Sequence, residues 1–288
     1  MKKLIKQFGA SLSPQEKKRL ALSKHWKEGK FENLETTTMD INPRTLPGLL
    51  KKQFTNTEGR EPKQNLPIAP FQAELFNTNS DKFIWYGHAL LLLKLENLNI
   101  LIDPMFGEDA SPIAPMQTKR FSTGSMAIIE QLPEIDYLLL THDHYDHLDM
   151  DSIMQLQTKV KNYIVPLGLS RHLVAWGLDK ELISEMDWWE TIALKDIQLS
   201  FTPSRHFSGR GLTDRAKSLW GGYLFKTPKR TLYLSGDGGY GPHFKEIEQL
   251  YGAVDFAFVE CGQYNQEWHQ IHMYPEESVQ AMLDVKAK

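Results

Sequence analysis

The sequence predicts an α/β protein in which one β-sheet packs on another and helices cover the outside. Apolar runs of strand length follow one another closely between about residues 80 and 105, as expected of a sheet formed early in the chain. From about residue 135 onward, strand patterns alternate with helix patterns. The length of 288 residues suits two average domains or one large layered domain.

The first 80 residues are expected to form a mostly helical extension packed on the core. In "SLSPQEKKRLALSKHW", Ser13 suits the N-cap, Pro14 the first helical position and Glu16 the third, which makes a capping box. "LPGLLKKQF" predicts a second short helix, and "NTEGREPKQNLPIAP" predicts a surface loop. The remaining residues, 81–288, are expected to form the main domain.

Within that domain the segments can be assigned in order. Strands are predicted for "KFIWYG", "ALLLLKL" and "LNILIDP", with "ENLN" as a hairpin turn between the last two. Next come a strand in "DYLLLT", a helix in "DMDSIMQLQ", a strand in "NYIVP" and a helix in "GLSRHLVAWG". Later strands are predicted for "IQLSFTP", "LWGGYLFKT", "RTLYLSGD" and "VDFAFVEC", and later helices for "GPHFKEIEQLYG" and "YPEESVQAMLDVKAK".

Composition excludes several classes of function. A net charge of −3 argues against nucleic acid as a partner. The only cysteine, Cys261, allows no internal disulfide and fits a reducing compartment. The N-terminus lacks the apolar segment of a signal peptide, and no run of about 18 apolar residues is present. We therefore expect a cytoplasmic protein with at most peripheral contact with a membrane.

The stretch "DYLLLTHDHYDHLD" places metal-ligand side chains directly after a predicted buried strand. His142 and His144 are two residues apart, so they face the same side of an extended segment. Asp146 and His147 follow at the turn into the next helix. Imidazole and carboxylate are ligands for zinc and similar ions, and burying them without a metal would be costly. A solvent-exposed polar turn is the alternative interpretation.

"THDHYDHLD" resembles the His-x-His-x-Asp-His signature of the metallo-β-lactamase superfamily. This resemblance implies a four-layer αββα sandwich with a binuclear metal site at one edge. "WYGHALLLLKLENLNILIDPMF", "TPSRHFSGRG", "LYLSGDGGYGPHFKEI", "VPLGL", "DWWE" and "HMYPEESVQ" extend the likeness from about residue 80 to the C-terminus. They are similar to one branch in particular, the N-acyl-phosphatidylethanolamine-hydrolysing phospholipase D enzymes and their bacterial relatives.

The resemblance also implies a metal-ligand set. One ion would be held by His142, His144 and His206. The second would be held by Asp146 and His147, with Asp237 bridging the two ions. Zinc is the expected metal, as one or two ions, with manganese or iron as alternatives. A metal-bound hydroxide would be the nucleophile, and Asp237 would orient or deprotonate it.

Four more residues are candidates for roles at the site. His272 occupies the place of a branch histidine that lies near the scissile phosphate, so we assign it a catalytic role, with a structural role as the alternative. Arg210 is assigned to substrate phosphate, with an internal salt bridge as the alternative. For Asp143 and His88, support of the ligands is favoured over direct ligation.

One departure from the family pattern concerns the second metal. The family continues into a strand ending in His-Trp-Gly, whose histidine completes that metal's ligand shell, whereas this sequence stops at Lys288. His269 and His272 are the nearest substitutes in sequence. The resemblance therefore predicts weak or partial occupancy of the second site and low turnover. It also predicts an unpaired sheet edge and a tendency to form homo-oligomers.

These observations support three functions. The first is a phosphodiesterase acting on a phospholipid or a small molecule. Its apolar entrance could be formed by Leu46, Leu49, Leu50 and Phe54 near Lys51 and Lys52, although an ordinary amphipathic helix packed on the core is the favoured interpretation of these residues. The second is a lactonase or another ester or amide hydrolase on the same scaffold. The third is a metal-binding protein of low activity.

Overall fold

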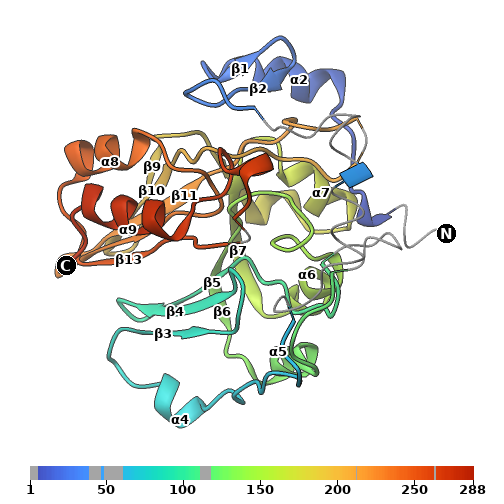
Figure 1. Ribbon diagram of the computed structural model, residues 1–288. Coiled ribbons are helices and arrows are strands. Elements are labelled where there is room, and N and C mark those ends of the chain that lie inside the picture. The colour runs from blue at the N-terminus through green and yellow to red at the C-terminus, as the bar shows by residue number, and fades with distance from the viewer. Residues whose placement is uncertain (1–5, 39–46, 49–60, 111–117, 212, 263) are drawn as a thin grey trace.

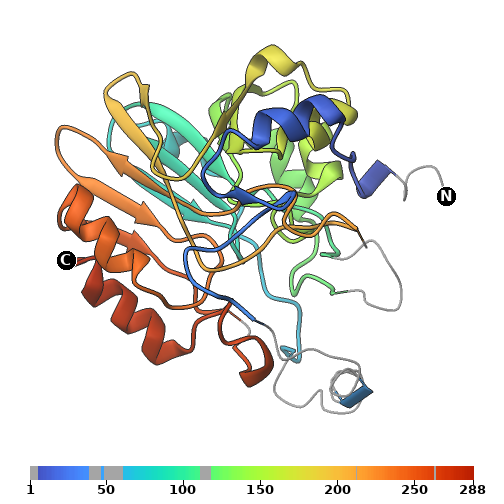
Figure 2. The same ribbon diagram turned by 90° about the horizontal axis from the view of Figure 1, so that it is seen from above.

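Two β-sheets stacked face to face form the centre of the protein, and helices cover both outer faces (Figures 1 and 2). The computed structural model describes residues 6–38, 47–48, 61–110, 118–211, 213–262 and 264–288. The predicted four-layer αββα arrangement is confirmed. The proposed entrance residues Leu46, Leu49, Leu50, Lys51, Lys52 and Phe54 lie outside the described part of the chain.

The first sheet has six strands in the order β3-β4-β5-β6-β7-β8. Their bounds are β3 Lys82–Trp85, β4 Leu91–Leu95, β5 Leu98–Ile102, β6 Ile135–Leu139, β7 Val160–Pro166 and β8 Ile183–Met186. The strands β3, β4 and β5 are antiparallel, whereas β5 to β8 run parallel. The predicted hairpin turn is confirmed, because Glu96 and Asn97 both have positive φ, the conformation of the two-residue turns that match strand twist.

The second sheet has five strands in the order β13-β12-β11-β10-β9. Their bounds are β9 Thr191–Leu194, β10 Ile197–Thr202, β11 Gly222–Lys226, β12 Thr231–Leu234 and β13 Phe256–Phe258. The first four are antiparallel, and β13 pairs parallel with β12. Strands β8 and β9 were missed by the sequence analysis, because "ISEM" and "TIAL" are four residues long and only partly buried.

Helices fill the two outer layers (Figure 2). Those over the six-stranded sheet are α5 Ile128–Gln131, α6 Met150–Leu156 and α7 Ser170–Ala175. The five-stranded sheet is covered by α8 His243–Tyr251 and α9 Pro275–Asp284. Short 3-10 turns lie at Ser125–Ala127, Lys180–Leu182 and Gln266–Trp268. No helix in the described ranges is long and apolar enough to cross a membrane.

Side-chain alternation along the strands divides the core into layers. Leu91 and Leu93 of β4 belong to the cluster between the two sheets, whereas Leu92 belongs to the cluster under the helices. Successive side chains on a strand point to opposite faces, so a strand buried on both faces needs a continuous apolar run. "ALLLLKL" is such a run.

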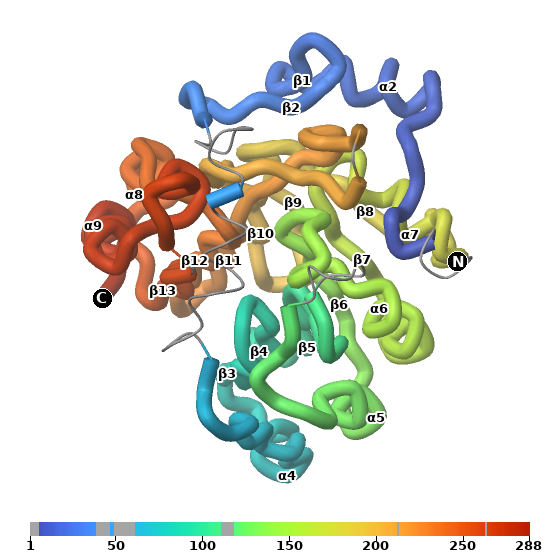
Figure 3. Tube along the Cα trace, turned by 45° about the vertical axis from the view of Figure 1, so that its right-hand side comes forward, coloured from blue at the N-terminus to red at the C-terminus, as the bar shows by residue number. Residues whose placement is uncertain are grey.

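The described N-terminal segments lie against this sandwich (Figure 3). They contain α2 Pro14–Leu20, whose predicted capping box at Ser13 is confirmed, and α4 Ala73–Phe76. They also contain a small hairpin of β1 Trp26–Lys27 and β2 Lys30–Phe31, which the sequence analysis did not predict. Phe31 is buried in the cluster between the sheets. The domain boundary at residue 80 stays a prediction.

Candidate metal centre

The predicted metal ligands come from three strand ends that meet at one edge of the sandwich. The segment after β6 carries His142, His144, Asp146 and His147. His206 follows β10 in the other sheet, and Asp237 follows β12. The structure brings all six together in overlapping groups, although His206 and Asp237 lie 59 or more residues along the sequence from the other four.

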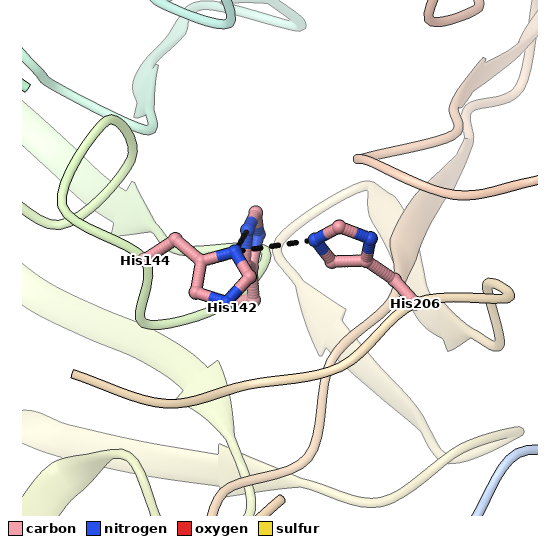
Figure 4. A group of neighbouring side chains, drawn as sticks. All are labelled: His142, His144 and His206. Carbon is pink, nitrogen blue, oxygen red and sulfur yellow. Dashed lines mark hydrogen bonds between the residues drawn. The ribbon is translucent and has the colours of Figure 1, made fainter. Parts of the chain in front are cut away.

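The first group consists of His142, His144 and His206 (Figure 4). The Nδ1 atom of His144 lies 2.9 Å from Nε2 of His142 and 3.2 Å from Nε2 of His206. His142 and His206 are each only 1 % exposed. Three imidazole nitrogens therefore converge from two different sheets on one buried point.

The second group consists of His88, Asp146 and His147. Nε2 of His88 lies 3.2 Å from Oδ2 of Asp146 and 3.3 Å from Nε2 of His147. His88 follows β3 and has a φ of 48°, which is uncommon for a residue other than glycine. The sequence analysis favoured a supporting role for His88, whereas the geometry places its ring nitrogen among the candidate ligand atoms. His269 joins none of these groups within the described residues.

Asp237 lies between the two groups. It forms a third cluster with His142 and His147, and a fourth with His206 and His272. Its Oδ2 is 3.3 Å from Nε2 of His147. Because His142 belongs to the first group and His147 to the second, a carboxylate near both is placed to bridge two ions.

Hydrogen bonds behind the imidazoles fix which nitrogen faces the centre. Nδ1 of His206 donates to the carbonyl of Ile271 at 3.0 Å, and Nδ1 of His147 donates to Oδ2 of Asp103 at 2.8 Å. Thr141 also donates to Asp103 through its hydroxyl, at 2.6 Å. Partners of this kind hold the tautomer in which the opposite nitrogen can bind a metal. Asp103 was not among the site residues predicted from the sequence. Its position directly after the buried strand in "LNILIDP" could have indicated it.

The charge states fit divalent cations. Burial and the neighbouring histidines hold the pKa of both His142 and His206 well below the ordinary value, so these rings are neutral and can donate lone pairs. Burial disfavours the charged form of Asp237, but the charge and hydrogen bond of His147 outweigh it, and its pKa lies well below the ordinary value. The neutral imidazoles of His142 and His206 beside the ionised carboxylate of Asp237 suit zinc and related ions.

Asp143 holds the segment after β6 in place through buried contacts. Its carboxylate is fully buried and accepts hydrogen bonds from Gly209 N and from the Ser218 hydroxyl, both at 2.7 Å. Nε2 of His172 lies 3.3 Å away, and the nearby Arg171 guanidinium adds positive charge. Asp143 joins none of the described candidate metal groups. Its contacts tie the segment after β6 to α7 and to the loop carrying His206.

His272 forms a cluster with His206 and Asp237 and is paired with a buried glutamate. Its Nδ1 is 2.9 Å from Oε2 of Glu260, and its ring centroid is 5.1 Å from that of His206. Burial disfavours the charged ring, but the hydrogen bond and charge of Glu260 outweigh it, and the pKa of His272 is raised. The sequence analysis did not single out Glu260.

Arg210 is committed to internal contacts. It is 4 % exposed, and its guanidinium donates to the carbonyls of Gln7, Asp143 and Leu148 at 2.7–2.9 Å. It also borders a cavity of about 310 Å³ whose lining includes the acidic residues Glu108, Asp109, Asp149 and Asp151. Carboxylates on that wall would repel a phosphate. The assignment of Arg210 to substrate binding therefore stays a prediction without support from these contacts.

The loop that carries Asp237 depends on glycines. Gly236 has a φ of 61°, and a Cβ there would lie 2.4 Å from the carbonyl oxygen of Gly221. At Gly239 a Cβ would lie 2.1 Å from the carbonyl oxygen of Gln270. Only residues without a side chain allow this loop to pack so closely between its neighbours.

Comparisons with known proteins agree with the fold and the site. The profile of the Beta-lactamase superfamily domain matches residues 98–288. An uncharacterized protein of Mycobacterium tuberculosis is 31 % identical over 265 residues, which are 91 % of this chain and 71 % of the relative. N-acyl-phosphatidylethanolamine-hydrolyzing phospholipase D 1 of Caenorhabditis elegans is 32 % identical over 237 residues, which are 77 % of this chain and 66 % of the relative. Igni18, a metallo hydrolase from the archaeon Ignicoccus hospitalis, superposes with a TM-score of 0.56 at 18 % identity, over 72 % of this chain and 79 % of that one.

A four-layer sandwich with clustered histidines and aspartates at one edge of its two sheets defines a metal-dependent hydrolase. The chain belongs to the metallo-β-lactamase superfamily.

Proposed function

We propose that the protein is a phosphodiesterase that hydrolyses N-acyl-phosphatidylethanolamine or a closely related phospholipid. The observation that carries this proposal is the pair of metal-ligand groups with Asp237 close to members of both, together with His272 in a further cluster with His206 and Asp237. The similarity to the phospholipase D of C. elegans supports the choice of a phosphodiester over other substrates.

In this proposal the metal ions occupy the two groups. His142, His144 and His206 would hold the first ion, His88, Asp146 and His147 would hold the second, and the carboxylate of Asp237 lies close to members of both groups. Zinc is the proposed metal because imidazoles dominate the set, with manganese or iron as alternatives. Divalent ions held there lower the pKa of a coordinated water towards 7 and polarise the phosphoryl oxygen.

The protein's own groups handle the protons and the substrate. The carboxylate of Asp237 faces both ligand groups, so it is placed to accept a proton from the attacking water. Nδ1 of His272 is occupied by Glu260, which leaves Nε2 to contact the phosphate or the departing oxygen. The attack breaks the bond between phosphorus and the ethanolamine oxygen and releases phosphatidic acid and an N-acylethanolamine.

An exposed aromatic side chain near the second group supports an amphiphilic substrate. Trp85 is 64 % exposed, and its Nε1 donates to the carbonyl oxygen of His88 at 2.7 Å. An indole tied to a candidate metal ligand offers an apolar surface to an acyl chain at the edge of the site. Contact with a lipid surface would then be peripheral.

The test is an assay panel on zinc-loaded protein. The substrates are N-acyl-phosphatidylethanolamine in mixed micelles, phosphatidylcholine, an acyl-homoserine lactone and a chromogenic β-lactam. We expect turnover of the N-acyl phospholipid, loss of turnover on chelation and, in ¹⁸O-labelled water, label in phosphatidic acid alone. Label in the N-acylethanolamine, or turnover of the lactone or β-lactam alone, would overturn the proposal.

Asp237→Asn tests the mechanism. It removes the negative charge shared by the two groups, so we expect kcat to fall by about 10²-fold or more, as for other groups that act in general acid–base catalysis. Asp196→Asn, at an exposed turn, is the matched control and should leave kcat unchanged. Full activity in Asp237→Asn would rule out the mechanism.

A further inference from the structure

We propose that Glu260 is the positioning residue for His272: it fixes the tautomer and direction of that ring beside the metal centre. The inference rests on the proposed function, in which His272 contacts the reacting phosphate. It adds to the proposed site a buried carboxylate, Glu260, which affects the substrate only through His272.

Glu260 is enclosed by three donors from two segments of the chain. Its Oε2 is 2.9 Å from Nδ1 of His272 and accepts from Gly238 N at 3.2 Å, and its Oε1 accepts from Met273 N at 2.8 Å. The Glu260 side chain is 8 % exposed, whereas that of His272 is 22 % exposed. The carboxylate is therefore inside the protein and the imidazole is the member of the pair that reaches solvent.

The backbone of Glu260 is fixed as firmly as its side chain. Its N–H donates to the Ser235 hydroxyl at 3.0 Å, and its carbonyl accepts from the Ser278 hydroxyl at 2.7 Å. Ser235 follows β12, Glu260 follows β13, and Ser278 lies in α9. A side chain anchored to both a sheet and a helix can impose a fixed direction on the imidazole that it binds.

The contacts determine what the pair does. A carboxylate that accepts from Nδ1–H keeps the proton on that nitrogen and leaves Nε2 facing outwards. His272 forms a candidate ligand cluster with His206 and Asp237, so its ring lies beside the centre. The N–H of Gly238, which also donates to Glu260, anchors the carboxylate in the position from which it directs the His272 ring.

The test is a double-mutant cycle on the zinc-loaded, full-length chain. Glu260→Gln keeps the size of the side chain but presents an amide where a carboxylate is needed. We expect kcat to fall by about 10–100-fold, the range seen when a partner behind an active imidazole is changed, with KM and zinc content little altered. His272→Ala should reduce kcat at least as much. Glu260→Gln added to His272→Ala should then cost nothing further, because Glu260 acts only through that ring.

A control variant and two contradicting outcomes make the cycle specific. Glu276→Gln changes an exposed glutamate in the first turn of α9 and should leave kcat unchanged. If Glu260→Gln reduces kcat equally in the presence and in the absence of the His272 ring, the role of Glu260 is merely structural and the inference is overturned. Loss of zinc from the Glu260→Gln protein would overturn it in the same way. The kinetics use whichever substrate of the panel is hydrolysed, so failure on phospholipid would refute the proposed function and leave this inference open to the same test.

A spectroscopic readout needs no substrate. Long-range ¹H–¹⁵N correlation spectra of the zinc-loaded protein report the tautomer of each histidine ring. The wild-type protein should show His272 with its proton on Nδ1, and Glu260→Gln should change that pattern while the signals of His206 persist. An Nε2-protonated His272 in the wild type, or an unchanged His272 pattern in Glu260→Gln, would overturn the inference.

Discussion

At the scale of single residues, the protein keeps several histidines neutral by burying them. The rings of the metal centre can bind ions through their lone pairs. His243, at the start of α8, is not one of these rings. It is 4 % exposed, and its Nε2 has no hydrogen-bond partner within the described structure. Burial, reinforced by the charge of Arg205, lowers the pKa of His243 to about 3. Such a ring makes stability depend on pH.

We predict that His243 sensitises the fold to acid. Above about pH 6.5 the ring is neutral in both states; between about pH 6.5 and 3 only the unfolded chain takes up the proton, so stability falls as pH falls. At about 1.4 kcal/mol per pH unit, the loss at pH 4.5 is about 2–3 kcal/mol. Urea unfolding of the wild type and of His243→Leu at pH 7.5 and 4.5 measures it. An equal loss in both proteins would contradict the prediction, and His269→Leu, at a more exposed site, should behave as the wild type.

A second prediction at this scale concerns His88. If His88 completes the second ligand group, His88→Ala should weaken the second zinc by at least about 10–100-fold, since even residues behind the ligands have effects of that size. Metal content after dialysis against buffered zinc measures both equivalents. The first equivalent should be unaffected, and His269→Ala should retain both. Two tightly held ions in His88→Ala would assign His88 a supporting role.

At the scale of elements, the loop after β6 is held from outside by the N-terminal segment. The guanidinium of Arg210 donates to the carbonyls of Asp143 and Leu148, which lie at the two ends of that loop. It also donates to the carbonyl of Gln7. Trp176 of the α7 C-cap donates to the carbonyl of Lys6, and the His172 ring accepts from Ala10 N. One guanidinium thus joins the N-terminal segment, the loop with the metal ligands and the loop of His206.

We predict that Arg210→Met lowers the free energy of unfolding by about 2–4 kcal/mol, because buried carbonyls lose a charged donor. KM should change little in the protein that remains folded. Urea unfolding and steady-state kinetics measure the two effects. Arg230→Met, at a half-exposed side chain, is the control. A large rise in KM with stability unchanged would instead support the assignment of Arg210 to substrate phosphate.

At the scale of the whole molecule, the layers and most of the centre follow from local patterns. Strand-length apolar runs predicted the two sheets, and the spacing in "THDHYDHLD" predicted four neighbouring ligand candidates that the structure groups together. The positions of His206 and Asp237 came from a resemblance, because no local pattern reveals which strand ends meet. His88, Asp103 and Glu260 contribute through contacts between distant segments, so a single sequence carries little sign of their roles.

The order of the strands along the chain has a consequence for biosynthesis. Every strand of the six-stranded sheet precedes every strand of the other sheet. A ribosome therefore delivers Leu91, Leu93 and Ile100 well before Phe201 and Tyr223, which cover them in the finished core. Until then the nascent chain exposes a wide leucine-rich surface, the kind of surface that chaperones bind. His142, His144, Asp146 and His147 also emerge during this interval. Free zinc can therefore reach them before the strands of the five-stranded sheet have been synthesised.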